Sequence, residues 1–167
     1  MSVKNIMKYT LTLTGAPDAT TDVLLPISSF SLRLRDSTKD SYLSCVVPNV
    51  SAYSALIAAR PNGNLILTGD WTLITCPITD IREQKGAQSS SITLTGYATI
   101  SNPVPTSHTV ETAFYTNNDP TGSFRIRTPV IQALPDDTLI YQSVSRTIES
   151  ISLSVNANQT QMEHSCV

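Results

Sequence analysis

The chain of 167 residues has little charge, and its few charges are dispersed. Only 14% of the residues are charged, against roughly 25% in an average soluble protein. The net charge is −2, and the eleven lysines and arginines are scattered, so nucleic-acid binding is not predicted. No apolar run approaches the ~20 residues that a membrane-spanning helix requires. We therefore expect neither nucleic acid nor a membrane span.

The chain also has few residues suited to catalysis, with three cysteines and two histidines. The N-terminus lacks the apolar core of a signal peptide, so we expect the cysteines to be reduced. Cys45 lies in an apolar run, which indicates a small buried hydrophobe. A catalytic thiol needs a histidine beside it, but His108 and His164 lie in a Pro/Ser-rich segment and a polar tail. With no acid/base pair and no calcium-type ligand spacing, we predict a protein that is not an enzyme and has no cofactor or metal.

Short stretches of alternating apolar and hydroxylated residues are abundant, and Ser and Thr make up about a quarter of the chain. This alternation is typical of β-strands, whose side chains point in turn to a core and outward. The clearest examples are residues 9–14, 30–35, 91–95 and 151–155. A charge-poor, hydroxyl-rich outer face favours burial against partners. A monomer with a hydroxyl-rich surface is the open alternative.

Turn-forming Gly, Pro and Asp residues delimit the remaining elements. One helix is predicted at about residues 50–60, where apolar side chains recur at helical spacing and alanines fill the rest. Asn49 or Ser51 is expected to cap its start, and Pro61 to follow its end. The other predicted strands lie at residues 42–47, 64–68, 71–75, 76–83, 89–100, 109–115, 123–128, 137–145 and 147–155.

The hairpin formed by residues 76–83 and 89–100 around a loop at 84–88 is the clearest local pairing. Its alternation predicts that Ile92 and Leu94 face the core and that Thr93 faces outward.

The many short strands predict a mainly β fold, a β-barrel or sandwich of short antiparallel strands with one short helix. Residues 1–100 are expected to form a β-barrel with the helix. Residues 101–167 are expected to add strands, loops and a C-terminal tail to the same domain. The end of the tail, residues 156–167, could form a last strand or remain free.

Two of the predicted strands carry paired arginines on one face. Arg33 and Arg35 alternate with leucines, and Arg125 and Arg127 flank Ile126. Guanidiniums arranged in this way can bind carboxylates of a neighbouring subunit with paired hydrogen bonds, and they suit an interface better than lysines. A solvated strand face with a cross-strand Asp or Glu is the alternative. The four arginines are therefore candidate interface residues.

Residues 22–100 resemble the hub and tail-tip β-barrel domains of tailed-bacteriophage proteins. The resemblance rests on the order of five segments, none of them a catalytic signature: strand 27–35, strand 42–48 ending in proline, helix 53–60, the Asn62-Gly63 turn with its apolar strand, and hairpin 81–96.

This resemblance implies a non-enzymatic structural virion protein of the tail tip or baseplate, made in the host cytoplasm and located in the tail. Its expected partners are other tail or baseplate proteins and further copies of itself, in a homo-oligomeric ring such as a trimer or hexamer. The alternative is a β-barrel binding module of a tail fibre or receptor-binding apparatus that recognises a host-surface carbohydrate or protein. Carbohydrate sites usually present exposed aromatics, and an aromatic content of 6% argues mildly against that alternative.

Overall fold

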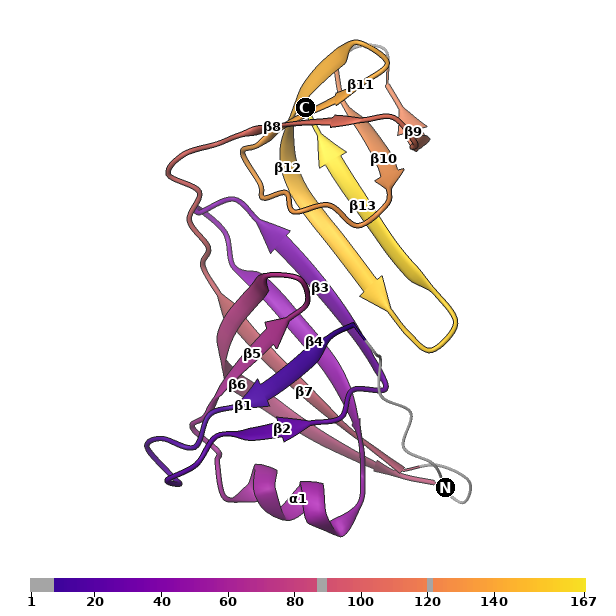
Figure 1. The fold of residues 1–167 in the computed structure, drawn as a ribbon. Helices are drawn as coiled ribbons and strands as arrows, with labels where there is room; N and C mark the ends of the chain where they lie inside the picture. The colour runs from indigo at the N-terminus through magenta and orange to yellow at the C-terminus, as the bar shows by residue number, and fades with distance from the viewer. Residues whose placement is uncertain (1–7, 87–89, 120–121) are drawn as a thin grey trace. The chain divides into compact units, whose positions relative to one another are not determined.

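The computed structural model describes residues 8–86, 90–119 and 122–167, which form thirteen strands and one helix (Figure 1). In chain order the elements are β1 (Thr10–Leu13), β2 (Val23–Leu25), β3 (Ser29–Arg35), β4 (Ser41–Pro48), α1 (Ser51–Ala58), β5 (Asn64–Thr68), β6 (Thr72–Lys85), β7 (Ser90–Ala98), β8 (Ser107–Val110), β9 (Phe114–Asn118), β10 (Phe124–Thr128), β11 (Thr138–Tyr141), β12 (Val144–Val155) and β13 (Thr160–Cys166).

The chain divides into two compact units. Unit 1 comprises residues 1–31, 42–98 and 155–158, and unit 2 comprises residues 32–41, 99–154 and 159–167. Strand β3 contributes its first residues to unit 1 and its last residues to unit 2.

The sheet of unit 1 follows the strand order β2-β1-β5-β6-β7-β4. Its strands alternate between buried apolar and outward polar side chains, as the sequence predicts. In β7, Ile92 and Leu94 are 1% and 0% exposed, which confirms the predicted inward face of this hairpin strand. The core of unit 1 consists of buried side chains from all these strands, including Leu11, Leu13, Leu25, Leu43, Cys45, Val47, Leu65, Leu67, Ile92 and Leu94.

The mainly β fold with one short helix is confirmed, but the sheet does not close into a barrel. Within the described residues, β2 lies at the end of the hydrogen-bonded order and pairs only with β1. Strand β2 has three residues, and its central residue Leu24 is 67% exposed. So short a strand offers few backbone groups for a second neighbour, which leaves the order open at this edge.

The helix α1 forms where it is predicted, but neither predicted residue caps it. Its N-cap is Val50, without a side-chain capping bond, and the backbone N–H groups of Tyr53 and Ser54 donate to the Val50 carbonyl. Asn49 instead remains part of the sheet, since its N–H donates to the Ser90 carbonyl at 3.1 Å.

Arg60 fixes the C-terminal end of α1 and is 4% exposed. Its guanidinium donates to the Leu56 carbonyl at 2.9 Å and, from both Nε and Nη2, to the Thr21 carbonyl at 3.1 and 2.9 Å. Leu56 provides one of the carbonyls that a helix end leaves without an intrahelical partner. Arg60 therefore ties the helix to the loop before β2.

Strand β6 is one continuous strand, where the sequence predicts two strands broken near Pro77. Proline cannot donate to a ladder, yet it is tolerated here because β6 changes neighbours at this point. Pro77 pairs with Asn64 at the end of β5, and pairing with β7 begins at Ile78 opposite Gly96. The predicted loop at 84–88 lies partly outside the described residues.

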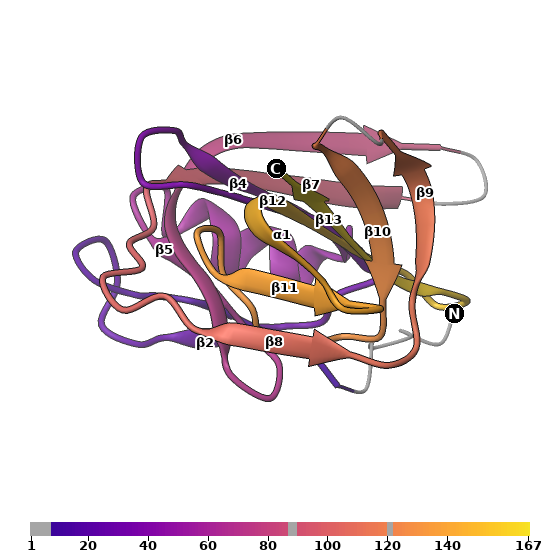
Figure 2. The same cartoon turned by 90° about the horizontal axis from the view of Figure 1, so that it is seen from above.

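Unit 2 contains the end of β3 followed by β12, β13, β10 and β9 in hydrogen-bonded order. Strand β11 pairs with β12, and β8 runs parallel to β11, as Figure 2 shows. The predicted strand 109–115 is divided between β8 and β9, because these two strands have different partners. The Tyr141 hydroxyl donates to the Ala113 carbonyl at 2.7 Å and holds the bend between them.

The C-terminal residues 160–166 form β13, one of the two alternatives left open for the tail. It pairs with β10 from Phe124 opposite Cys166 to Thr128 opposite Met162. Its buried side chains are Met162, His164 and Cys166, which alternate with outward residues. His164 thus lies in the interior of unit 2 and not in a frayed tail.

Candidate functional site

Strand β3 presents two arginines on its outer face. Leu32 and Leu34 are 2% and 3% exposed, so the alternation places Arg33 and Arg35 on the opposite face. The backbone N–H of Arg35 donates to Ser41 Oγ at 2.8 Å, which joins the end of β3 to the start of β4.

A tight turn after β3 places Lys39 near these arginines. Asp36 Oδ1 accepts from the backbone N–H of Thr38 at 2.9 Å and also from its hydroxyl, and the Lys39 N–H donates to the Asp36 carbonyl at 3.0 Å. The two Thr38 hydrogen bonds lower the pKa of Asp36, because they stabilise its charged form. Asp36 therefore acts as the turn-forming residue.

Arg125 reaches the same surface from β10. It pairs with Ser165 of β13, and its neighbours Phe124 and Ile126 are buried. Arg127 points outward on the same strand, but its Nε lies 3.4 Å from Glu163 Oε2 and its Cζ lies 5.8 Å from the centre of the Phe114 ring. The charge of Arg127 is thus compensated by Glu163 on the neighbouring strand.

Between β3 and β13, strand β12 supplies Glu149 and Ser150. Ile148 is buried, and so are Ile151 and Leu153, so the alternation of burial shifts by one residue at Ser150. Glu149 and Ser150 both line the same surface, although Ser150 is only 9% exposed.

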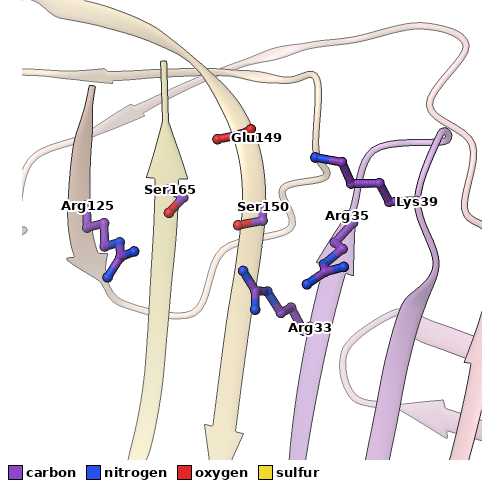
Figure 3. Close-up of a pocket in the computed structure, with 7 residues that line it drawn as sticks. All are labelled: Arg33, Arg35, Lys39, Arg125, Glu149, Ser150 and Ser165. Atoms are coloured by element: carbon purple, nitrogen blue, oxygen red, sulfur yellow. The ribbon is translucent and has the colours of Figure 1, made fainter. Parts of the chain in front are cut away.

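We call this surface the basic groove. Figure 3 shows its members, drawn from β3, the following turn, β12, β13 and β10. Four cations and one carboxylate give the groove a net charge of +3. None of the four cations forms a close ion pair in the described part of the chain, although the Asp36 carboxylate attracts Lys39 and Arg35. The groove is lined by Arg33, Arg35, Lys39, Arg125, Glu149, Ser150 and Ser165.

The spacing of the groove suits an extended anionic partner. Neighbouring strands lie about 4.8 Å apart, so β3 and β10, three strands apart in the order, are separated by about 14 Å. Arg33 and Arg35 are separated by about 7 Å along β3. In Figure 3 the side chains of Arg33 and Arg125 point toward the strands that lie between β3 and β10. Carboxylates on alternate residues of an extended segment have a comparable spacing of about 7 Å.

The sequence singled out four arginines, and the structure brings Arg33, Arg35 and Arg125 into one groove while Arg127 lies outside it. Lys39 and Glu149 were missed. Lys39 follows the strand in a polar turn, and Glu149 is an ordinary outward residue, so only long-range strand order brings them together.

The three cysteines are free and buried. Burial raises the pKa of Cys45, Cys76 and Cys166 to about 12, 11 and 12, so all three thiols stay protonated. The burial of Cys45 as a small apolar residue is confirmed by its 0% exposure.

His108 binds Asp137, which holds a loop of unit 2 in place. Asp137 accepts from His108 Nε2, the Thr106 N–H, Asn102 Nδ2 and the Leu134 N–H at 2.8 to 2.9 Å. Burial pushes the pKa of Asp137 upward, but these hydrogen bonds outweigh it and lower the pKa. Asp137 therefore has a structural role in holding this loop. No three His, Cys, Asp or Glu residues in the described ranges are arranged to hold a metal.

The structure resembles tail proteins. A tail protein from Neisseria meningitidis aligns with a TM-score of 0.60 and 8% identity, over 95% of each chain. The 43 kDa tail protein of a Shewanella oneidensis prophage aligns with a TM-score of 0.64 and 6% identity, over 96% of each chain.

A third similar structure is an Escherichia coli component of the type VI secretion system, described as structurally similar to the T4 bacteriophage tail proteins gp27 and gp5. It aligns with a TM-score of 0.61 and 5% identity, over 94% of this chain and 76% of that one. No protein-family model and no curated protein matches the sequence. The chain therefore has the fold of these tail proteins, and the resemblance to tailed-bacteriophage proteins is confirmed at the level of the fold.

Proposed function

We propose that this chain is a non-enzymatic structural subunit of a bacteriophage tail, located in the virion at the tail tip or baseplate. The observation that carries the proposal is the likeness to two tail proteins over at least 95% of each chain. The buried, protonated thiols argue against a nucleophilic enzyme. The one described helix has eight residues, too few to reach across a bilayer.

The basic groove is proposed as the surface through which the subunit binds a neighbour. Its unpaired cations would bind carboxylates of the adjacent subunit, with Arg33, Arg35 and Arg125 as paired hydrogen-bond donors. Such charge complementarity fixes the register of two partners and excludes wrong ones.

The charge of the groove favours a ring over a two-fold dimer. In a two-fold dimer whose axis passes through the groove, the groove would meet itself, which would place cation against cation. A head-to-tail contact instead joins the groove to a different, carboxylate-bearing surface, and repeated rotation closes it into a ring. We therefore propose that the chain forms a cyclic homo-oligomer of three or six copies. Its further partners would be other tail or baseplate proteins.

Native mass spectrometry of the full chain tests this proposal. The wild type is expected to form a closed ring, and Arg33→Glu to shift the population toward monomer because it reverses one charge of the groove. Lys85→Glu makes the same charge change at an exposed position outside the groove and should leave the ring intact. A wild-type chain that stays monomeric, alone and with its tail neighbours, would contradict the assembly role.

A further inference from the structure

The outer face of β4 and β7 in unit 1 carries a pair of tyrosines with exposed ring surface. The ring centres of Tyr42 and Tyr97 lie 6.1 Å apart, and the ring planes are tilted by 39°. Tyr97 is 47% exposed. The pair lies opposite the buried face of β4, where Leu43 is 0% exposed. The rings therefore contribute contact surface to the outside of the sheet.

Polar groups adjoin the rings on the neighbouring strand β6. Arg82 Nε donates to Asp80 Oδ2 at 2.8 Å, so the two charges compensate each other. Asp80 pairs with Thr95 and Arg82 pairs with Thr93 across the ladder to β7. Since β7 lies between β6 and β4, Thr93 and Thr95 lie between the ion pair on β6 and Tyr42 on β4, and Tyr97 follows them on β7 itself. All six residues line one depression, which we call the tyrosine platform.

We propose that the tyrosine platform binds an uncharged oligosaccharide. A sugar ring has an apolar C–H face that packs on an aromatic ring, and hydroxyls around its edge that both donate and accept hydrogen bonds. The platform offers both kinds of contact: two rings, and beside them a carboxylate acceptor, a guanidinium donor and two hydroxyls that do either.

The charge of the platform selects against an anionic ligand. The Asp80–Arg82 pair leaves it neutral, in contrast to the basic groove with its net charge of +3. A partner protein surface would gain little from these hydroxyls unless each found a hydrogen bond, because an unpaired polar group loses its hydration on burial. This inference does not depend on the proposed tail function, since it concerns residues of unit 1, whereas the basic groove lies in unit 2.

Titration of the full isotope-labelled chain with maltotriose, cellotriose and chitotriose, followed by NMR, tests the inference. At least one trisaccharide is expected to shift resonances around Tyr97 and Thr95 with millimolar affinity. Tyr97→Ala should weaken this binding about tenfold by removing the exposed ring, and Tyr97→Phe should retain it. Asp80→Asn tests the polar residues of the tyrosine platform. It should weaken binding several-fold, because it removes a charged acceptor.

Phe114→Ala is the matched control, since Phe114 is an exposed aromatic of unit 2 with 57% exposure and lies outside the platform. It should leave saccharide binding unchanged. Binding that survives Tyr97→Ala, or no shift with any of the three sugars at roughly 10 mM, would overturn the inference. A loss of self-association in Tyr97→Ala without saccharide binding would assign the face to a protein contact and also overturn it.

Discussion

His164 is a buried histidine with an incomplete set of hydrogen bonds. It is 0% exposed on β13, and its Nε2 lies 2.9 Å from Thr128 Oγ1. Its Nδ1 has no hydrogen-bond partner among the described residues. Burial, with a smaller contribution from the charge of His108, lowers the pKa of His164 to about 4. The imidazole is therefore neutral in the folded protein at neutral pH.

We predict that acid destabilises the fold through His164. In the unfolded chain this histidine takes up a proton near pH 6.5, whereas the folded protein does not until about pH 4. The unfolded state thus binds more protons between these values, and the free energy of unfolding should fall by about 3 kcal/mol as the pH drops from 6.5 to 4. Urea unfolding followed by circular dichroism at a series of pH values measures this fall.

The variant His164→Gln serves as the control because glutamine keeps a polar group beside Thr128 but does not titrate. Its free energy of unfolding should depend less on pH between 6.5 and 4 than that of the wild type. Asp137 does not confound the comparison, because its lowered pKa places its effect at more acidic pH. Identical pH profiles for the two proteins would show that His164 is not responsible.

Among the elements, the β11–β12 hairpin has a turn whose backbone does not suit its residues. Tyr141 pairs with Val144, so the loop consists of Gln142 and Ser143 alone. Their φ angles are 50° and 64°, both in the left-handed region. Two consecutive positive φ values define a type I′ turn, which favours Asn followed by Gly. Glutamine and serine are strained in this conformation.

We predict that replacing the two turn residues by Asn-Gly, with Gln142→Asn and Ser143→Gly, stabilises the protein. The strain relieved is expected to raise the free energy of unfolding by about 1 kcal/mol, measured by urea unfolding. Gln142→Val should act in the opposite direction, because a β-branched side chain is especially unfavourable at positive φ. Destabilisation by Asn-Gly would show that the hairpin does not form this turn in solution.

The elements also show which parts of the fold are predictable from sequence. Strands β3, β4 and β7 are predicted closely because one of their faces is buried and the other is not. Apolar and polar residues therefore alternate along their sequences. The unbroken β6 was missed, since whether Pro77 interrupts a strand depends on where a distant partner ends. The same holds for the division between β8 and β9, which have different partner strands.

The candidate sites were likewise predictable only where they depend on local sequence and not on strand order. Alternation identified Arg33 and Arg35 as outward neighbours on one strand, a local fact. That Arg125 joins them depends on β12 and β13 lying between β3 and β10, and no local pattern carries that order. The sequence does not predict the tyrosine platform. The aromatic content gives only the number of aromatic residues, whereas binding depends on which of them lie together on adjacent strands.

At the scale of the whole molecule, neither unit is a continuous piece of chain. Unit 2 takes residues 32–41 from the middle of the N-terminal half, including the buried Leu32 and Leu34. Leu32 and Leu34 belong to β3, which follows β4 and precedes β12 in the hydrogen-bonded order. Without them, β12 loses a neighbour strand and the core of unit 2 loses two leucines. Folding of unit 2 therefore requires a segment distant in the sequence.

We predict that a fragment of residues 99–167 does not fold cooperatively by itself. Deleting two buried leucines and one strand removes about 4–10 kcal/mol, comparable with the 5–15 kcal/mol that stabilises a whole domain. Residues 1–98 lack only residues 155–158 of unit 1 and should retain a dispersed NMR spectrum. Fusing residues 29–48 to the N-terminus of 99–167 through a Gly/Ser linker should restore dispersion, because it returns β3. A well-dispersed spectrum and a sharp unfolding transition for 99–167 alone would show that β3 is dispensable to unit 2.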